Sequence, residues 1–314
     1  MTVNRRTFLA GTVGLLAAGS VEPAFAQAIK NIKVGHTAAV DYAPAWVAID
    51  KGYFAKRNLN VGIEIVSLNP MIPAALQSNS IDIGTPTASV LLQAVVGGLD
   101  LVAIAGSSFT SKQSKMFGVV AGAKTKITKP EDLVGKRVAF PGLLAFQHVL
   151  FRQWLIDKNI DYNKVQQIEV PLPQMNDALR SGNVDAVVLS EPNMSRITTA
   201  GNGNVISYYT QELPDHILTA PYCARRDWAE RNRDTIEAFR AGLTEGVAYA
   251  HDHTDDLRAL TEKTLKLPKE TIASIAFPVF DAALSKADIQ FWIDIMTKQG
   301  ILKGKVKAED VLFT

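Results

Sequence analysis

The chain has 314 residues, of which 47% are hydrophobic and 20% are charged, and its formal net charge is +2. This length is enough for one or two domains with buried cores, and the composition is unlike that of a disordered or fibrous protein. The near balance of charge argues against nucleic-acid binding, which needs a basic face.

The N-terminal residues 1–26 have the pattern of an export signal. The pair Arg5-Arg6 precedes an apolar run over 9–21, and Ala24-Phe25-Ala26 fits a small-x-small cleavage site. The run is short for a membrane span of about 20 residues, and the arginine pair resembles a twin-arginine signal. We therefore expect a soluble periplasmic protein with no membrane insertion after cleavage; the alternative is that the segment is retained as an anchor.

The next part of the chain alternates between strand and helix patterns. Apolar runs of four to six residues separated by amphipathic segments are typical of a parallel sheet that is covered on both faces. The pattern predicts strands at 29–35, 61–66, 81–83 and 101–105, and helices starting at Pro44 and spanning 70–77 and 87–96.

The same order returns after a polar stretch at 110–115. We predict strands at 117–121, 136–140, 165–170, 184–189 and 205–209, with helices at 144–159 and 173–181. The remaining chain reads as helices at about 227–250, 255–265 and 286–299, the last opened by a Ser285–Asp288 capping box. These helices have no counterpart in the second set, so we expect them to cover the first.

A short segment is repeated between the two sets. Residues 75–83 (ALQSNSIDI) match residues 178–186 (ALRSGNVDA), and in both a helix ends just before an apolar strand and a polar loop. The distance between the copies is too long for a solenoid repeat, so it indicates two similar lobes. With crossings near 111–116 and 214–222, we expect lobe 1 at 27–115 and 218–314, and lobe 2 at 116–217.

Three blocks carry a family resemblance. Residues 46–54 (WVAIDKGYF) with Leu59-Asn60-Val61, then 131–138 (EDLVGKRV), and 178–185 together resemble periplasmic substrate-binding proteins of ABC transporters. The subfamily is that of nitrate, taurine and aliphatic-sulfonate binders with the related thiamine-precursor binders. The resemblance implies a type II fold, in which two Rossmann-like lobes close about a hinge on a ligand in the interlobe cleft. It also implies a monomer that performs no chemistry and delivers its ligand to an ABC transporter permease. Some pyrimidine-binding relatives carry a cysteine-rich block, which this chain lacks.

The candidate binding residues lie in loops that follow the predicted strands, where open α/β sheets hold ligands. Hydroxyls and free N–H groups at a helix start can bind an anion, although each hydroxyl could instead cap its own helix. Ser107 and Ser108 are expected in such a loop. The candidate set is His36, Asp41, Tyr42, Thr85, Thr87, Ser89, Ser107, Phe146, Gln147, Glu191 and Asn193.

These loops carry two carboxylates but no Lys or Arg, so a small inorganic dianion would be poorly compensated. We therefore predict an organic anion whose acidic end binds the Thr and Ser hydroxyls. Its amino, amide or hydroxyl end would meet Asp41 or Glu191, and Tyr42 would stack on its middle. A pyrimidine or thiamine-precursor ligand, or an enzyme on the same fold, remains an alternative.

No cofactor, metal or catalytic residue is expected. The chain has no Gly-rich nucleotide loop, His-Glu metal motif or Gly-x-Ser-x-Gly elbow. Cys223 is the only cysteine, which excludes an intramolecular disulfide, and we expect it to be a buried small hydrophobe.

Overall fold

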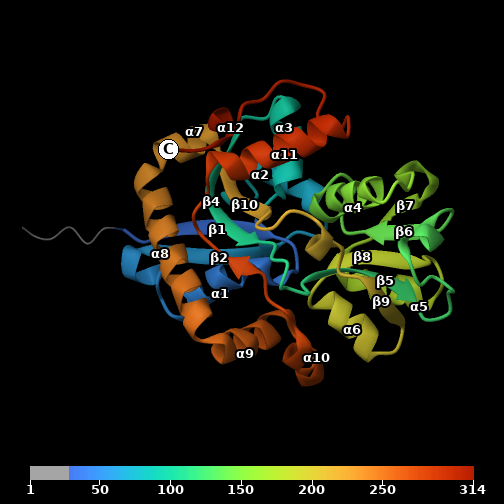
Figure 1. Ribbon diagram of the computed structural model, residues 1–314. Coiled ribbons are helices and arrows are strands. Elements are labelled where there is room, and N and C mark those ends of the chain that lie inside the picture. The colour runs from blue at the N-terminus through green and yellow to red at the C-terminus, as the bar shows by residue number, and fades with distance from the viewer. Residues whose placement is uncertain (1–27) are drawn as a thin grey trace, which may run out of the picture.

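A computed structural model describes residues 28–314, and the predicted export signal lies outside these residues. The described chain forms two lobes, each built on one β-sheet (Figure 1). The lobe 1 sheet has the order β11-β4-β10-β3-β1-β2 and the lobe 2 sheet has the order β7-β6-β8-β5-β9. The bounds in lobe 1 are β1 Lys30–His36, β2 Leu59–Ile65, β3 Ile83–Gly84, β4 Leu101–Phe109, β10 Leu218–Arg225 and β11 Val279–Phe280. Those in lobe 2 are β5 Phe117–Gly122, β6 Arg137–Phe140, β7 Gln166–Glu169, β8 Ala186–Ser190 and β9 Gly203–Ser207.

The expectation of fully parallel sheets is wrong, because both sheets are mixed. In lobe 1, β1 pairs parallel to β2 and β3, while β10 is antiparallel to β3 and β4. In lobe 2, β6 is parallel to β7 and β8, while β5 is antiparallel to β8 and β9. The reason is topological: β5 and β10 each enter their lobe from a crossing, so they run against strands whose carboxyl ends face the other lobe.

The repeated segment has the same local geometry in both lobes. The Asp82 carboxylate accepts the Lys33 backbone N–H at 2.8 Å, and the Asp185 carboxylate accepts the Arg137 backbone N–H at 2.9 Å. In each copy the helix is followed by a left-handed residue, Asn79 (φ 58°) in one and Gly182 (φ 76°) in the other. The repeat therefore encodes a helix end and an aspartate that accepts a backbone N–H of the neighbouring strand.

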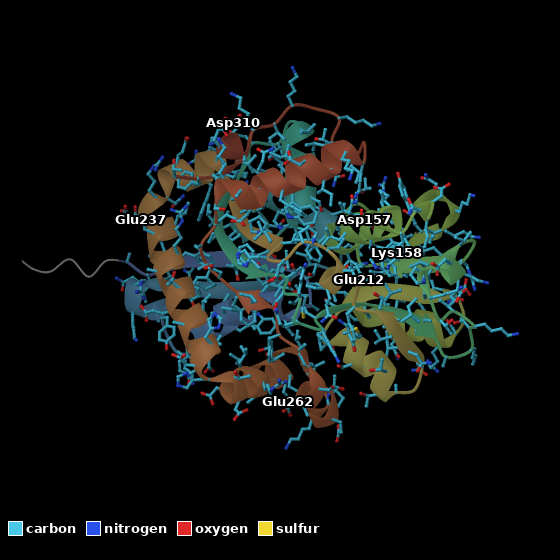
Figure 2. All side chains as sticks on the ribbon, viewed as in Figure 1. Asp157, Lys158, Glu212, Glu237, Glu262 and Asp310 are labelled. Carbon is cyan, nitrogen blue, oxygen red and sulfur yellow. The ribbon has the colours of Figure 1, made fainter. Side chains whose placement is uncertain are left out.

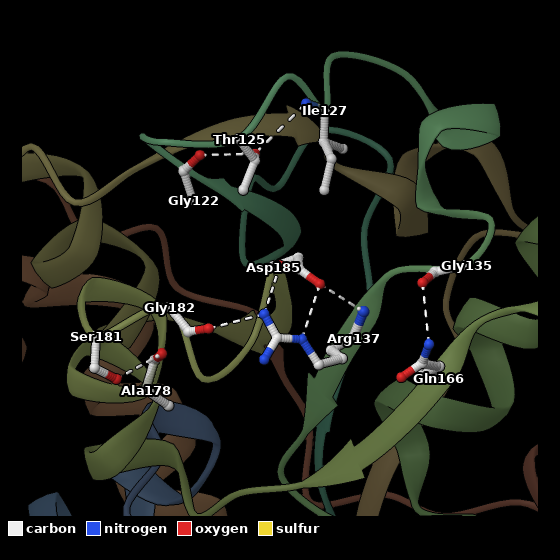
Figure 3. Close-up of polar contacts among 10 residues, drawn as sticks. All are labelled: Gly122, Thr125, Ile127, Gly135, Arg137, Gln166, Ala178, Ser181, Gly182 and Asp185. Carbon is white, nitrogen blue, oxygen red and sulfur yellow. Dashed lines mark hydrogen bonds and ion pairs between the residues drawn. The ribbon is translucent and has the colours of Figure 1, made fainter.

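In lobe 2 this aspartate has a stronger partner. The Arg137 guanidinium donates to both Asp185 oxygens, Nε at 3.1 Å and Nη2 at 2.9 Å, and also to the Gly182 carbonyl (Figure 3). Hydrogen bonding by Arg137 holds the pKa of Asp185 below its ordinary value. The Asp185 side chain is 24% exposed and that of Arg137 is 40% exposed. Salt therefore screens this ion pair less than a fully exposed surface pair.

Replacing Asp185 with asparagine is expected to lower the free energy of unfolding by about 1–2 kcal/mol, because charged hydrogen bonds to Arg137 are lost. A lowered pKa stabilises the fold above the unfolded-state pKa, and this stabilisation is lost as the pH falls through the folded-state value. The difference in unfolding free energy between wild type and Asp185→Asn should therefore shrink in acid. Urea unfolding at neutral and acidic pH measures this difference. Asp177→Asn, which breaks the exposed Asp177–Arg180 pair, is the matched control and should change stability by less than about 0.5 kcal/mol.

Helices cover both sheets, and the C-terminal helices α8 and α11 pack on lobe 1 helices α1 and α3 (Figure 1). The longest, α8, lies on α1, with Gly246 against the Pro44 carbonyl and the Phe239 ring stacked on Phe54 at 5.1 Å. The predicted Ser285–Asp288 capping box opens α11. The bounds are α1 Ala43–Asp50, α2 Ile72–Gln77, α3 Ala88–Val96, α4 Phe146–Asp157, α5 Met175–Arg180, α6 Asn193–Thr199, α7 Arg226–Arg231, α8 Arg233–Asp252, α9 Thr254–Leu265, α10 Lys269–Ser274, α11 Lys286–Lys298 and α12 Ala308–Val311.

Two crossings join the lobes, and they are hydrogen-bonded to each other. The Thr110 N–H donates to the Ile217 carbonyl at 2.9 Å, and the Lys112 N–H donates to the Asp215 carboxylate at 2.9 Å. The second crossing lies earlier in the chain than expected, because β9 ends at Ser207 and residues 218–222 already belong to β10. On the lobe 2 side, Lys158 at the end of α4 pairs with Glu212 at 2.6 Å (Figure 2). We propose the lobe boundaries given above on the basis of this sheet membership.

The lobes also share a hydrophobic contact away from the crossings. Phe146 of lobe 2 lies 4.8 Å from the Phe117 ring and 5.7 Å from the ring of Trp292 on α11. The Gln299 side chain, just after α11, donates to the Val149 carbonyl at 3.1 Å. The two lobes are therefore closed on each other along the α4–α11 side.

Candidate functional site

A small cavity of about 30 Å³ lies between the lobes, at the carboxyl ends of β1, β3, β6 and β8. This is room for water but not for an organic solute. The lining residues are Thr37, Ala39, Asp41, Tyr42, Asn69, Thr87, Thr219 and Ala220 from lobe 1, and Phe117, Pro141, Ala145, Phe146, Gln147, Leu172 and Ser190 from lobe 2. Of the predicted residues, the structure brings together Asp41, Tyr42, Thr87, Phe146 and Gln147.

Two helices of opposite lobes start at this cavity. Helix α3 follows Thr87, and helix α4 follows Ala145. Neither N-cap side chain accepts a hydrogen bond from its helix, so the first N–H groups are not satisfied by capping. Orphan N–H groups and the positive ends of two helix dipoles, facing one cavity, form an arrangement suited to an anion.

Asn69, which is not among the predicted residues, fixes the loop before α3. Its amide donates to the Thr85 carbonyl at 3.1 Å and accepts the Thr87 N–H at 2.8 Å. Asn69 is buried and lines the cavity. Its position before a proline in a turn was the available sequence signal, but the partner loop is close only in the folded chain.

Asp41 is a buried carboxyl group without a basic partner. It is 5% exposed, and among residues 28–314 it takes part in no ion pair. Burial raises its pKa, and the Ser108 hydroxyl, which donates to it at 2.9 Å, partly offsets this. The ammonium group of a ligand would compensate the buried negative charge of Asp41.

His36 supports the cavity wall but does not line the cavity. Its Nδ1 lies 2.7 Å from the Thr37 carbonyl and its Nε2 accepts the Trp46 indole N–H at 3.0 Å, which places the proton on Nδ1. Burial lowers its pKa to about 4, so the ring is neutral at pH 7. It stacks on Tyr42 at 4.7 Å and thereby orients that ring.

Three predicted hydroxyl residues are buried beside the cavity without lining it. Thr85 donates to the Gly35 carbonyl at 3.3 Å, Ser107 donates to the Ala220 carbonyl, and Ser89 lies 3.1 Å from the Thr87 hydroxyl. The predicted loop at Ser107 and Ser108 is wrong, since both belong to β4. Neighbouring residues of a strand point to opposite faces, so it is Ser108 that reaches Asp41.

Glu191 and Asn193 also lie outside the cavity. Asn193 is the first residue of α6 and is buried. Glu191 lines a separate, larger hollow and accepts hydrogen bonds from the Ser195 N–H (3.0 Å) and hydroxyl (2.8 Å). The structure does not bring Glu191 together with Asp41. Cys223 is buried, as predicted.

Replacing Glu191 with glutamine is expected to stabilise the protein at pH 8 by about 1–3 kcal/mol, because it removes a buried charge. Burial raises the pKa of Glu191 from 4.5 to about 7. A raised pKa gives stability that is complete below pH 4.5 and is lost as the pH rises through about 7. Thermal unfolding from pH 4.5 to pH 8 should thus show the two proteins converging in acid. A constant difference at all pH values would contradict the assignment.

Comparison with known proteins gives a family and a fold. The sequence profile of the family described as "NMT1/THI5 like" matches residues 39–256. The nitrate/nitrite binding protein NrtA of Synechococcus elongatus is 22% identical, with 86% of this chain and 67% of that protein covered. A putative aliphatic sulfonates-binding protein of Escherichia coli is 27% identical (65% and 62% covered). A formylaminopyrimidine-binding protein of Halalkalibacterium halodurans is 28% identical (67% and 63% covered). The chain thus spans about two thirds of the length of these relatives.

The fold matches that of solved binding proteins. The alkanesulfonate-binding protein SsuA of Xanthomonas axonopodis pv. citri superposes with a TM-score of 0.79 at 18% identity, covering 92% of this chain and 99% of that one. The two-lobed type II periplasmic-binding fold predicted from the sequence is confirmed. Among residues 28–314, no helix is long and apolar enough to cross a membrane, and no cluster of His, Cys, Asp or Glu could hold a metal ion.

Proposed function

Because this chain belongs to the NMT1/THI5-like family, we propose that it is the extracytoplasmic solute-binding component of an ABC importer. It captures a small organic anion that also carries an amino group, and hands it unchanged to a permease. It works as a periplasmic monomer and is not an enzyme. The relatives that are named as nitrate- and sulfonate-binding proteins support this role.

The observation that carries the proposal is the pairing of two features in one cavity. The N-termini of α3 and α4 face it from opposite lobes, and the buried Asp41 carboxyl lines it from lobe 1. A ligand with an acidic and an amino end satisfies both, whereas an inorganic anion satisfies only the first. A short aminosulfonate or amino carboxylate meets this description.

Several contacts must combine to give useful affinity. Each helix N-terminus contributes about 0.3–1 kcal/mol, while micromolar binding requires about 8 kcal/mol. The remainder would come from the hydrogen bonds of Thr87, Gln147 and Asp41 and from apolar contact with Tyr42 and Phe146. We assign Thr85, Ser89, Ser107 and His36 to holding these groups in place.

Ligand entry requires the lobes to open. The cavity of about 30 Å³ is smaller than any amino acid, so a ligand must enter an open form and the lobes must settle on it. The paired crossings at 110–116 and 208–217 are the segments that would bend. The measured affinity for the ligand therefore depends on the equilibrium between the open and the closed arrangement of the lobes.

Isothermal titration calorimetry of the protein with 2-aminoethanesulfonate, ethanesulfonate, ethanolamine and nitrate tests the proposal. We expect the aminosulfonate to bind at least about tenfold more tightly than the three compounds that lack one of its ends. Thr87→Ala should weaken this binding, and Asp177→Asn, on the surface of lobe 2, should not. Tighter binding of nitrate or of ethanesulfonate would overturn the zwitterion assignment.

A pyrimidine precursor is the second candidate. The formylaminopyrimidine-binding relative and the two aromatic rings at the cavity, Tyr42 and Phe146, favour it. Adding formylaminopyrimidine to the same titration separates the two ligands. Recovery of the ligand unchanged after prolonged incubation separates binding from catalysis.

A further inference from the structure

A second and much larger hollow, of about 650 Å³, opens beside the crossings. It is lined by lobe 2 residues of α6, by lobe 1 residues around α10, and by residues of both crossings. It shares no lining residue with the small interlobe cavity. The side chains that matter here are Lys115, Glu191, Ser195, Tyr208, Ser274 and Phe277.

Glu191 forms the acidic end of this hollow. It is 3% exposed, and among the residues that the structure describes it takes part in no ion pair. A carboxylate has about four acceptor positions, and Ser195 fills two of them. The other positions are free to accept N–H donors from a bound cation, which would compensate the buried charge.

Lys115 provides a positive charge in the same hollow. Its side chain is exposed, its Nζ lies 5.3 Å from the centre of the Tyr208 ring, and it too forms no ion pair within the described chain. A simple cation would be repelled by Lys115 and a simple anion by Glu191. Tyr208 and Phe277 also line the hollow and add apolar surface to it.

We propose that this hinge hollow is a second binding site, for a small amino acid zwitterion whose ammonium group bonds to Glu191 and whose acidic group faces Lys115. The separation of the two charges selects the chain length of the ligand. The site does not depend on the identity of the solute that occupies the small cavity.

A ligand in this hollow would touch both lobes. The Ser274 hydroxyl of α10 donates to the Ser195 hydroxyl of α6 at 3.2 Å, and the Ser114 hydroxyl donates to the Phe277 carbonyl at 3.0 Å. An occupant that bonds to Glu191 beside Ser195 and packs on Phe277 adds a further bridge to the closed form. By linkage, it should raise the affinity of the cavity for its own solute.

The test is a calorimetric titration with unbranched ω-amino acids from glycine to 6-aminohexanoate. Because the small cavity is itself proposed to bind an amino group through Asp41, the full mature protein carries Asp41→Asn, which removes that contact, and is compared with Asp41→Asn/Glu191→Gln and Asp41→Asn/Lys115→Gln. We expect at least one member to bind the Asp41→Asn protein, with affinity lowered about tenfold by adding Glu191→Gln and several-fold by adding Lys115→Gln.

The pH dependence provides an independent readout. Because an ammonium group binds ionised Glu191, affinity should rise from pH 6 to pH 8 in Asp41→Asn and stay flat in Asp41→Asn/Glu191→Gln. Absence of binding to Asp41→Asn by the whole series overturns the proposal, as does binding that survives the addition of Glu191→Gln. Lys115 is exposed, so Lys115→Gln gives a second variant of the site that leaves the core intact.

Discussion

Replacing Gly142 with alanine is expected to weaken solute binding by about ten- to a hundredfold, because the added methyl group holds the lobes apart. A Cβ at Gly142 of lobe 2 would lie 2.8 Å from Cδ and 3.2 Å from Cγ of Pro70 of lobe 1. Real Cβ contacts are longer than the first of these distances, so the two lobes must separate locally. Gly142 is not left-handed, so alanine fits its backbone, and within lobe 2 the new Cβ would lie 3.1 Å from Ala145 Cβ, which a small local shift relieves.

The partner residue offers a control for this variant. Pro70→Ala removes both of the Pro70 atoms that the new methyl group would meet, so the double variant Gly142→Ala/Pro70→Ala should regain most of the affinity. Calorimetry gives the affinity, and small-angle X-ray scattering of the ligand-bound form gives the radius of gyration. If the single variant binds as tightly as wild type with the same radius, contact between Gly142 and Pro70 does not govern closure.

The features that could be predicted from the sequence are those in which local pattern and chain order suffice. Segments 75–83 and 178–186 match because each must end a helix and place an aspartate, Asp82 or Asp185, against a backbone N–H of a neighbouring strand. Two copies of this device imply two similar lobes. The helices after Arg225 were assigned to lobe 1 by counting elements, and α8 lies there.

The site was harder to predict because it depends on which way each side chain points at the end of a strand. Ser107 and Ser108 are adjacent in β4, yet only Ser108 bonds to Asp41, since their side chains leave opposite faces of the sheet. Ser190 and Glu191 divide in the same way between the small cavity and the hinge hollow. If a strand end is predicted one residue too early or too late, the wrong side chain is assigned to the cavity. Sequence patterns do not locate strand ends to within one residue.

The sequence also could not reveal which polar groups are already satisfied. Thr85 and His36 are residue types that bind anions, but Gly35, Thr37 and Trp46 take up their hydrogen bonds. These partners come from different elements of lobe 1. The groups that can still bond to a ligand are the Asp41 carboxyl and the first N–H groups of α3 and α4. They could be recognised only from the folded structure, which shows the neighbours of each group.

Replacing Asp41 with asparagine should stabilise the ligand-free protein while weakening solute binding. Asparagine has nearly the same shape and still accepts the Ser108 hydroxyl through its carbonyl oxygen, but it carries no charge to desolvate. We expect a gain of about 1–3 kcal/mol in the free energy of unfolding at pH 8. Because burial raises the pKa of Asp41, its charge opposes folding only above the unfolded-state pKa, so the gain should fade in acid.

The same substitution removes the proposed partner of the ligand's amino group. The affinity for 2-aminoethanesulfonate should fall by about ten- to a hundredfold, and that for ethanesulfonate should change little, because the latter has no ammonium group. Chemical unfolding and calorimetry measure the two effects on one sample. Ser108→Ala is the matched control: it keeps the charge but removes a hydrogen bond to it, so it should destabilise the ligand-free protein. If Asp41→Asn instead lowers stability and affinity for both sulfonates equally, Asp41 serves the architecture of lobe 1 and a different group must select the ligand.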